Sequence, residues 1–282
     1  MSQRLGTPAR LLLAASLVML TAGGTIASAG NVRITGSTTV YPLAQTAAEI
    51  FMEENSGVEI TVMGTGSSDG IKSVIQGSAE IGNASRNAKQ KEWDLAKSKG
   101  IQLVEHVVAL DCIVPIVHPS NPVKNLTAEQ LQAIYTGKVH NWSELGGKDE
   151  PILVVSRDAA SGTFEVWNKL ILKKAAQRGD VMIEESNSAV AEIVSSKPNA
   201  LGYVGIGYLA PTIKGLSVNG IEATVETAQN SSYPVSRKLY MYTNGEPTGA
   251  VKQFLDFVTS PEGAEIAADE GFVPAMSRMA QR

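Results

Sequence analysis

From Val32 onward the chain alternates short β-branched runs with segments of helical periodicity, and this alternation restricts the fold more than any other feature. Such an order is typical of α/β folds, in which helices connect strands that run parallel. We expect strands at 32–35 and 58–63, each followed by a helix, at 42–54 and 71–76. The sequence therefore predicts an α/β fold with a largely parallel sheet.

Each of the first three expected strands ends in a turn of small and hydroxyl-bearing residues. The turns span 36–39, 64–70 and 84–86, the last after a short strand at 80–83. Ligands of open α/β sheets bind beyond the carboxyl ends of the strands, which is where these turns lie. We expect them to present hydroxyl groups and backbone N–H groups at one edge of the sheet.

The segment 154–164 has the composition of an anion-binding site at the start of a helix. Ser161 is a good N-cap, Gly162 lets a ligand approach the backbone, and Thr163 adds a hydroxyl group. The first N–H groups of a helix lack intrahelical partners and carry a partial positive charge. Arg157 adds a fixed positive charge that suits a carboxylate, phosphate or sulfate. Alternatively, Ser161 only caps a helix over 164–174 and Arg157 is a surface charge.

The rest of the chain is less regular. The apolar run 107–117 is a strand candidate, although Pro115 within it argues against a central position in the sheet. Thr127 and Gln130 form a capping-box pattern that starts a helix. We also expect strands at 201–208 and 238–242, and two C-terminal helices, at 250–259 and 261–269.

Residues 1–29 have the three parts of a secretory signal peptide. Arg4 and Arg10 form the basic region, 11–20 is apolar, and 27–29 reads Ala-Ser-Ala. We expect cleavage near Ala29, and export to the periplasm without lipid attachment.

Charge and cysteine content exclude several classes of protein. The net charge is −4, and removal of 1–29, which holds two arginines and no acid, makes it −6. Such an acidic chain is a poor candidate for binding nucleic acid. The single cysteine, Cys112, forms no internal disulfide and is expected to be buried. The scattered histidines do not suggest a metal site, and no cofactor is predicted.

Five motifs occur in the order found in the phosphate-binding subunit of phosphate ABC transporters, which the chain resembles from about Val32 to Pro274. They are Gly36-Ser37-Thr38-Thr39-Val40-Tyr41-Pro42-Leu43, Gly64-Thr65-Gly66-Ser67-Ser68-Asp69-Gly70-Ile71, Ile81-Gly82-Asn83-Ala84-Ser85-Arg86, Arg157 with Ser161-Gly162-Thr163-Phe164, and Leu201-Gly202-Tyr203-Val204-Gly205-Ile206-Gly207-Tyr208.

This resemblance implies a type 2 periplasmic binding protein fold, with two α/β lobes, two crossover hinge strands and a ligand cleft between the lobes. Lobe I would comprise 30–108 plus 239–282, and lobe II 109–238, with crossovers near 107–112 and 236–242. The implied protein is a monomer that binds inorganic phosphate and delivers it to a membrane permease. It is not an enzyme and does not insert into the membrane.

The resemblance also implies the ligand-binding residues. They are Ser37, Thr38, Thr39, Ser67, Ser68, Ser85, Arg157, Ser161, Gly162 and Thr163.

One position departs from the family pattern. Several members carry an aspartate at the end of the third strand that accepts the phosphate proton, and here Arg86 takes that place. Arg86 is either a second cationic ligand or a surface residue, and Asp69 is our candidate for the acceptor. We expect Asp158 to pair with Arg157.

Other functions stay open. A binding protein for sulfate or molybdate, or an exported phosphate sensor, would share the fold. Gly66-Ser67-Ser68-Asp69-Gly70 also fits the G-x-S-x-G pattern of a serine hydrolase, with Ser68 as nucleophile. Too few residues precede this motif for such a fold, and His106, His118 and His140 do not follow an acid in the required order.

Overall fold

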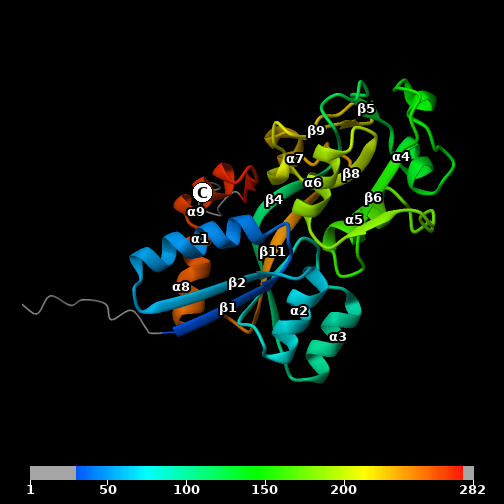
Figure 1. Cartoon of the computed structure of the whole chain (residues 1–282). Coiled ribbons are helices and arrows are strands. Elements are labelled where there is room, and N and C mark those ends of the chain that lie inside the picture. The colour runs from blue at the N-terminus through cyan, green and yellow to red at the C-terminus, as the bar shows by residue number, and fades with distance from the viewer. Residues whose placement is uncertain (1–29, 276–282) are drawn as a thin grey trace, which may run out of the picture.

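The computed structural model describes residues 30–275 as two lobes joined through one long sheet (Figure 1). The first part of the chain contains β1 (Gly30–Gly36), α1 (Tyr41–Glu54), β2 (Val58–Gly64), α2 (Ser67–Gln76), β3 (Ile81–Ala84) and α3 (Gln90–Ser98). The middle contains β4 (Leu103–Val117), β5 (Asn125–Leu126), α4 (Ala128–Tyr135), β6 (Leu153–Arg157), α5 (Gly162–Leu170), β7 (Met182–Glu184), α6 (Asn187–Ser196), β8 (Ala200–Gly205), β9 (Lys214–Gly215), β10 (Ser217–Val218) and α7 (Val225–Gln229). The last part contains β11 (Ser236–Asn244), α8 (Gly249–Val258), α9 (Pro261–Asp269) and β12 (Val273–Pro274). Short 3-10 helices lie at Trp142–Leu145 and Ile206–Tyr208.

The strand order in the sheet is β2-β1-β3-β11-β4-β8-β6-β7, with β9 and β12 also paired to β4. Strands β1, β2 and β3 are parallel in one lobe, and β6, β7 and β8 are parallel in the other. Strands β4 and β11 run antiparallel between these two groups. The predicted α/β fold with parallel strands is confirmed in both lobes.

The long strand β4 belongs to both lobes. Residues Leu103–Cys112, except Val108 at a register shift, pair with β11, and Ile113–Val117 pair with β8. The chain therefore crosses between the lobes in β4 and returns in β11, so the fold has two crossover strands. The lobe boundaries given above in residue numbers stay a prediction.

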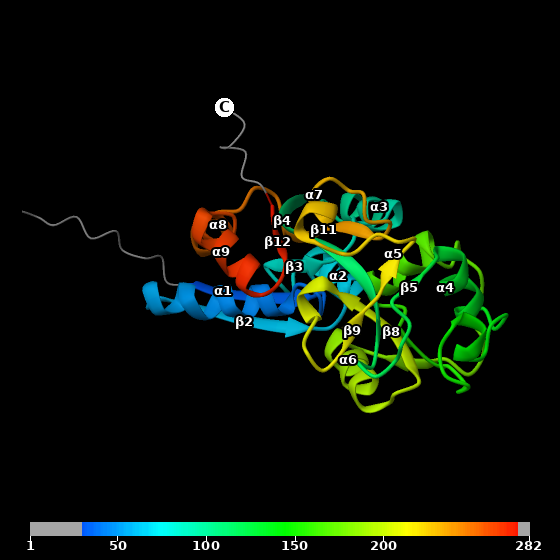
Figure 2. The same ribbon diagram turned by 90° about the horizontal axis from the view of Figure 1, so that it is seen from above.

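Helices cover both faces of the strands in each lobe, which gives each lobe its own core. In the first lobe α1, α8 and α9 pack with Val32 and Ile34 of β1, whereas α2 and α3 pack with Tyr240 and Tyr242 of β11. In the second lobe α4 and α5 cover one face and α6 the other. Seen from above, α8 and α9 lie at one end of the molecule and α4 and α5 at the other (Figure 2).

Alternating burial along the strands explains these layers. Val154 of β6 packs in the cluster beside α5, and the next residue, Val155, packs in the cluster beside α6. Successive side chains of a strand point to opposite faces, so a sheet covered on both sides needs apolar residues at both positions. Cys112 is buried, as predicted.

Two sequence predictions are wrong in detail. Pro115 lies inside the central strand β4, opposite Tyr203. Proline lacks an N–H group, but the carbonyl oxygen of Pro115 still accepts a hydrogen bond from the N–H of Leu216 (N···O 2.8 Å), so the strand continues through it. Helix α5 ends at Leu170 rather than at residue 174, because Lys173 and Lys174 have positive φ angles of 52° and 66°. Left-handed residues cannot continue a right-handed helix.

Most expected helices are confirmed, among them α1 and the helix that Thr127 and Gln130 cap. The predicted signal peptide lies outside the described residues. Between residues 30 and 275 the structure has no helix that is both long and apolar enough to cross a bilayer.

Candidate anion-binding site

Hydroxyl groups from both lobes meet at the carboxyl ends of β1, β3 and β6. The turn after β1 begins at Gly36, where a side chain would lie 2.2 Å from the carbonyl oxygen of Asn83 at φ +134°. Ser37 Oγ accepts hydrogen bonds from the backbone N–H groups of Thr39 (3.2 Å) and Val40 (3.4 Å). These bonds fix the turn and aim the next two threonines into the cleft.

Thr38 and Thr39 link the two lobes directly. Thr38 Oγ1 accepts from Arg157 Nη2 at 3.1 Å, and Thr39 Oγ1 lies 2.9 Å from Thr163 Oγ1. Asn187 Nδ2, at the start of α6, donates to both threonine hydroxyls at 3.1 Å. All five side chains are buried, so the lobes are closed on one another through polar contacts.

Arg157 is the last residue of β6 and carries a buried charge. Its side chain donates to the carbonyl oxygens of Glu184 (3.0 Å) and Glu185 (2.7 Å), and the residue is 2% exposed. Nη1 is buried and has no hydrogen-bond partner among the described residues. Burial lowers the pKa of Arg157, yet arginine stays protonated in proteins. The site therefore holds a positive charge that no carboxylate of residues 30–275 contacts.

Helix α5 starts beside this charge. Ser161 Oγ accepts from the N–H of Phe164 (3.1 Å), so Ser161 is the N-cap. Gly162 packs so closely on the other lobe that a Cβ atom there would lie 2.3 Å from Ser67 Oγ and 2.8 Å from Ser85 Oγ. Ser67 Oγ in turn accepts from the N–H of Ser85 at 3.0 Å. The start of a helix, two serines and a guanidinium thus surround one point of the cleft.

A second arginine enters the site from the crossover strands. Arg237 of β11 donates through Nη2 to Thr39 Oγ1 (3.2 Å) and Thr163 Oγ1 (3.1 Å), and through Nε to Asp111 Oδ2 of β4 (2.7 Å). Burial raises the pKa of Asp111, and the charge of Arg237 opposes this rise. The pair contributes fixed hydrogen-bond donors with little net charge.

Comparison with known proteins gives the family of this chain. Residues 22–262 match the model of the PBP superfamily domain. The chain is 36% identical to the phosphate-binding protein PstS of Bacillus subtilis over 88% of this chain and 81% of that protein. It is 33% identical to PstS of Borreliella burgdorferi over 86% of this chain and 89% of that protein. The chain belongs to the PstS family of the PBP superfamily.

A solved structure of the same fold comes from Clostridium perfringens. It is a putative phosphate ABC transporter substrate-binding protein with bound phosphate. It is 39% identical to this PstS-family chain, covers 87% of this chain and 100% of its own, and has a TM-score of 0.82. The type 2 binding-protein fold expected from the resemblance is confirmed.

Within this PstS-family chain, the described polar contacts of two other predicted site residues, Arg86 and Ser68, do not include Arg157. Arg86 is buried, but Glu92 and Glu165 neutralise it, and its Nη2 donates to Ser68 Oγ at 3.0 Å. Ser68 is half-buried and its N–H donates to the carbonyl oxygen of Ala160 (3.1 Å). Asp69 is exposed. A role for these three in ligand binding stays a prediction.

One expected contact has a different partner, and the serine of the hydrolase-like motif is engaged elsewhere. Asp158 does not contact the guanidinium of Arg157, because its Oδ1 accepts from the N–H groups of Ala160 (3.0 Å) and Ser161 (2.9 Å) and so shapes the turn before α5. The hydroxyl group of Ser68, the serine of the hydrolase-like motif, accepts a hydrogen bond from Arg86. The described hydrogen bonds of His106 and His118 go instead to Thr243 and Ser120.

Sequence reasoning missed Arg237, Asp111 and Asn187. Arg237 and Asp111 are direct partners in the antiparallel register of β11 and β4, and nothing local in either segment marks that pairing. Asn187 follows the N-cap Ser186 of α6.

Proposed function

We propose that this chain is the periplasmic phosphate-binding subunit of an ABC transporter, which binds inorganic phosphate between its lobes and delivers it to a membrane permease. The observation that carries the proposal is the buried guanidinium of Arg157, whose Nη1 has no hydrogen-bond partner and which contacts no carboxylate in the described part of the chain. The relatives named above point the same way, because two carry the name phosphate-binding protein and one holds phosphate.

The proposed binding mode uses mostly neutral donors. Hydroxyl groups of Thr38, Thr39, Ser67, Ser85 and Thr163 and the first N–H groups of α5 would replace the water around the oxyanion, with Arg157 supplying charge. Net hydrogen-bond contributions to a charged partner are about 1.5–3 kcal/mol each. Four or five such contacts suffice for a micromolar complex, about −8 kcal/mol, after the costs of ordering and desolvation.

A related oxyanion, sulfate or molybdate, is the second candidate. The observation in its favour is that Asp111, the buried carboxylate near the threonines, already accepts from Arg237 and from the N–H of Ile206 (2.9 Å). A site without a free carboxylate acceptor lacks the simplest means of rejecting a fully ionised anion.

Calorimetric titration with phosphate, sulfate and molybdate at pH 5 and pH 8 decides between these ligands. We expect Arg157→Ala to weaken phosphate binding by about 2–5 kcal/mol, roughly 30-fold to several thousand-fold in Kd. The control is Arg33→Ala, which removes an arginine that pairs with Glu80 at the surface. Unchanged phosphate affinity in Arg157→Ala, or wild-type binding of sulfate alone, would overturn the proposal.

The proposal includes export of a mature chain that begins after Ala29. The mass of the protein recovered from the periplasm tests the cleavage site and the absence of a lipid.

A further inference from the structure

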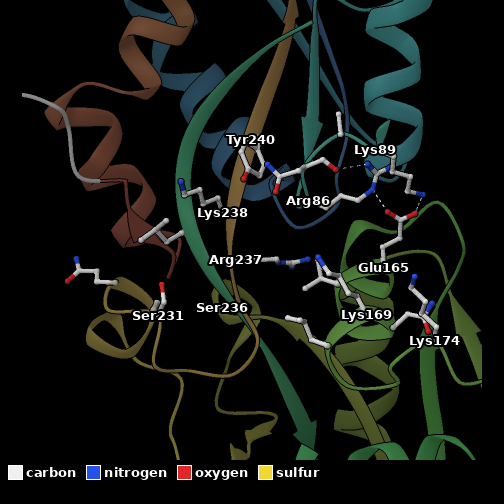
Figure 3. Close-up of a pocket in the computed structure, with 18 residues that line it drawn as sticks. Arg86, Lys89, Glu165, Lys169, Lys174, Ser231, Ser236, Arg237, Lys238 and Tyr240 are labelled. Carbon is white, nitrogen blue, oxygen red and sulfur yellow. Dashed lines mark hydrogen bonds and ion pairs between the residues drawn. The ribbon is translucent and has the colours of Figure 1, made fainter. Parts of the chain in front are cut away.

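A solvent-open groove of about 1060 Å³ runs between the lobes beside the crossover strands (Figure 3). The first lobe contributes Arg86–Lys89 and Tyr240, and the second contributes α5 residues, Lys174 and the end of α7. Arg237 lies in the middle of the view, between Lys238 on one side and Lys169 on the other. The lining of the groove does not include Thr38, Thr39 or Thr163, although Arg237 lines it and also donates to Thr39 and Thr163.

The groove is strongly positive. Six of its lining residues are cationic, namely Arg86, Lys89, Lys169, Lys174, Arg237 and Lys238. Glu165 is the acidic residue of the lining, and Glu92 and Asp111 pair with the two arginines from outside it. Three carboxylates against six cations leave three positive charges. They stand out in a chain whose net charge is −4.

Three of the lysines have no acidic partner. None of the ion pairs within residues 30–275 includes Lys169, Lys174 or Lys238, and all three are exposed. Like charges brought together on one surface repel one another, so their convergence points to a ligand of opposite charge.

Lys174 has a strained backbone conformation. Lys173 and Lys174 both have positive φ, and the N–H of Lys174 donates to the carbonyl oxygen of Asn168 at 2.9 Å. Lysine in the left-handed region is strained, and such strain clusters at sites that bind ligands. The sharp turn after α5 brings Lys174 to the same wall of the groove as Lys169.

We infer that this groove is a second anion site, which takes a short linear polyanion such as a condensed phosphate chain. Its volume fits a ligand much larger than one oxyanion. Lysine ammonium groups act as mobile point charges that follow a flexible chain of charges rather than one fixed geometry. The positive charges are spread over both walls, so a chain that bridges them makes more contacts than a compact ion.

Tripolyphosphate is the probe for this site, titrated into protein that is already saturated with inorganic phosphate. We expect one tripolyphosphate to bind per chain without displacing phosphate. The variant Lys169→Gln with Lys174→Gln should weaken this binding by about ten-fold or more at low ionic strength and leave phosphate affinity unchanged. The control, Lys72→Gln with Lys148→Gln, makes the same charge change at exposed positions elsewhere.

The inner site is tested separately with Arg157→Ala, which should keep tripolyphosphate binding even if it loses phosphate. Failure of the proposed phosphate function would therefore leave this result intact. Adenosine triphosphate distinguishes a nucleotide from an inorganic polyphosphate as the ligand of the groove. If it binds more tightly than tripolyphosphate, the ligand is a nucleotide, and if the two bind equally, the ligand is an inorganic polyphosphate. The inference is overturned if phosphate competes with tripolyphosphate, or if the groove variant binds it as tightly as the control variant.

Discussion

Replacing Gly162 with alanine separates closure of the lobes from stability of the fold. Gly162 is the first residue of α5 and faces the other lobe across the cleft. A Cβ atom there lies 2.3 Å from Ser67 Oγ, 2.9 Å from Ser67 Cβ and 2.8 Å from Ser85 Oγ. Atoms in favourable contact are about 3.5 Å apart or more, so the two lobes must separate by about 1 Å.

The size of the effect follows from this overlap. Overpacking a tight contact costs about 1–3 kcal/mol. Since the cost falls on the closed form alone, phosphate Kd should rise about 5- to 150-fold. The open form has no such overlap, because Ser67 and Ser85 belong to the other lobe. In the open form, replacing glycine with alanine in the helix raises the free energy of unfolding by up to about 1 kcal/mol.

Three measurements test this reasoning. Calorimetry gives Kd, urea unfolding without phosphate gives the free energy of unfolding, and X-ray scattering with and without phosphate gives the change in radius of gyration on closure. Gly179→Ala is the matched control, because a Cβ atom there meets nothing within 4 Å. If Gly162→Ala binds phosphate as tightly as the wild type and contracts as much, the close approach of α5 does not set closure. A loss of several kcal/mol in unfolding free energy would also refute the argument.

Two further predictions concern ionisable groups. Glu165 of the second lobe pairs with Arg86 and Lys89 of the first. We expect Glu165→Gln to weaken phosphate binding about five-fold, which corresponds to about 1 kcal/mol for a part-exposed ion pair. The prediction is contradicted if the variant and the wild type have the same phosphate Kd at low salt and at high salt. Burial lowers the pKa of His106 below its ordinary 6.5, so the unfolded chain binds a proton first as pH falls and stability is lost from about pH 6.5 downward. His106→Gln should lose less unfolding free energy than the wild type between pH 7.5 and 5.5 by urea titration, and an equal loss would exclude this role.

Local patterns predicted the parts of the site that are built locally. Ser161 caps α5 because an N-cap is specified by a residue and the N–H groups two or three positions later. The position of Arg157 at a strand end follows from the apolar run before it. Both features depend on contacts within about five residues, and both were visible in the sequence.

Long-range contacts were not visible in the same way. The pairing of Arg237 with Asp111 depends on the register of β11 against β4, two strands more than a hundred residues apart in the chain. The state of Arg86 depends on Glu165, which the other lobe supplies. A charge that the sequence shows becomes a ligand group or half of an ion pair according to which carboxylate the fold brings beside it.

The three buried arginines of the cleft show what this difference means for binding. Arg86 and Arg237 have carboxylate partners in the closed form, whereas the acceptors that the described residues offer Arg157 are carbonyl and hydroxyl oxygens. Because arginine cannot shed its proton, closure without a ligand leaves one uncompensated charge out of water, which is costly. An anion that enters removes this cost in the closed form and gains less in the open form, where water already solvates Arg157. A ligand shifts the lobes toward closure only if it binds the closed form more tightly than the open form. In this site the difference in affinity therefore comes mainly from the unpaired guanidinium of Arg157.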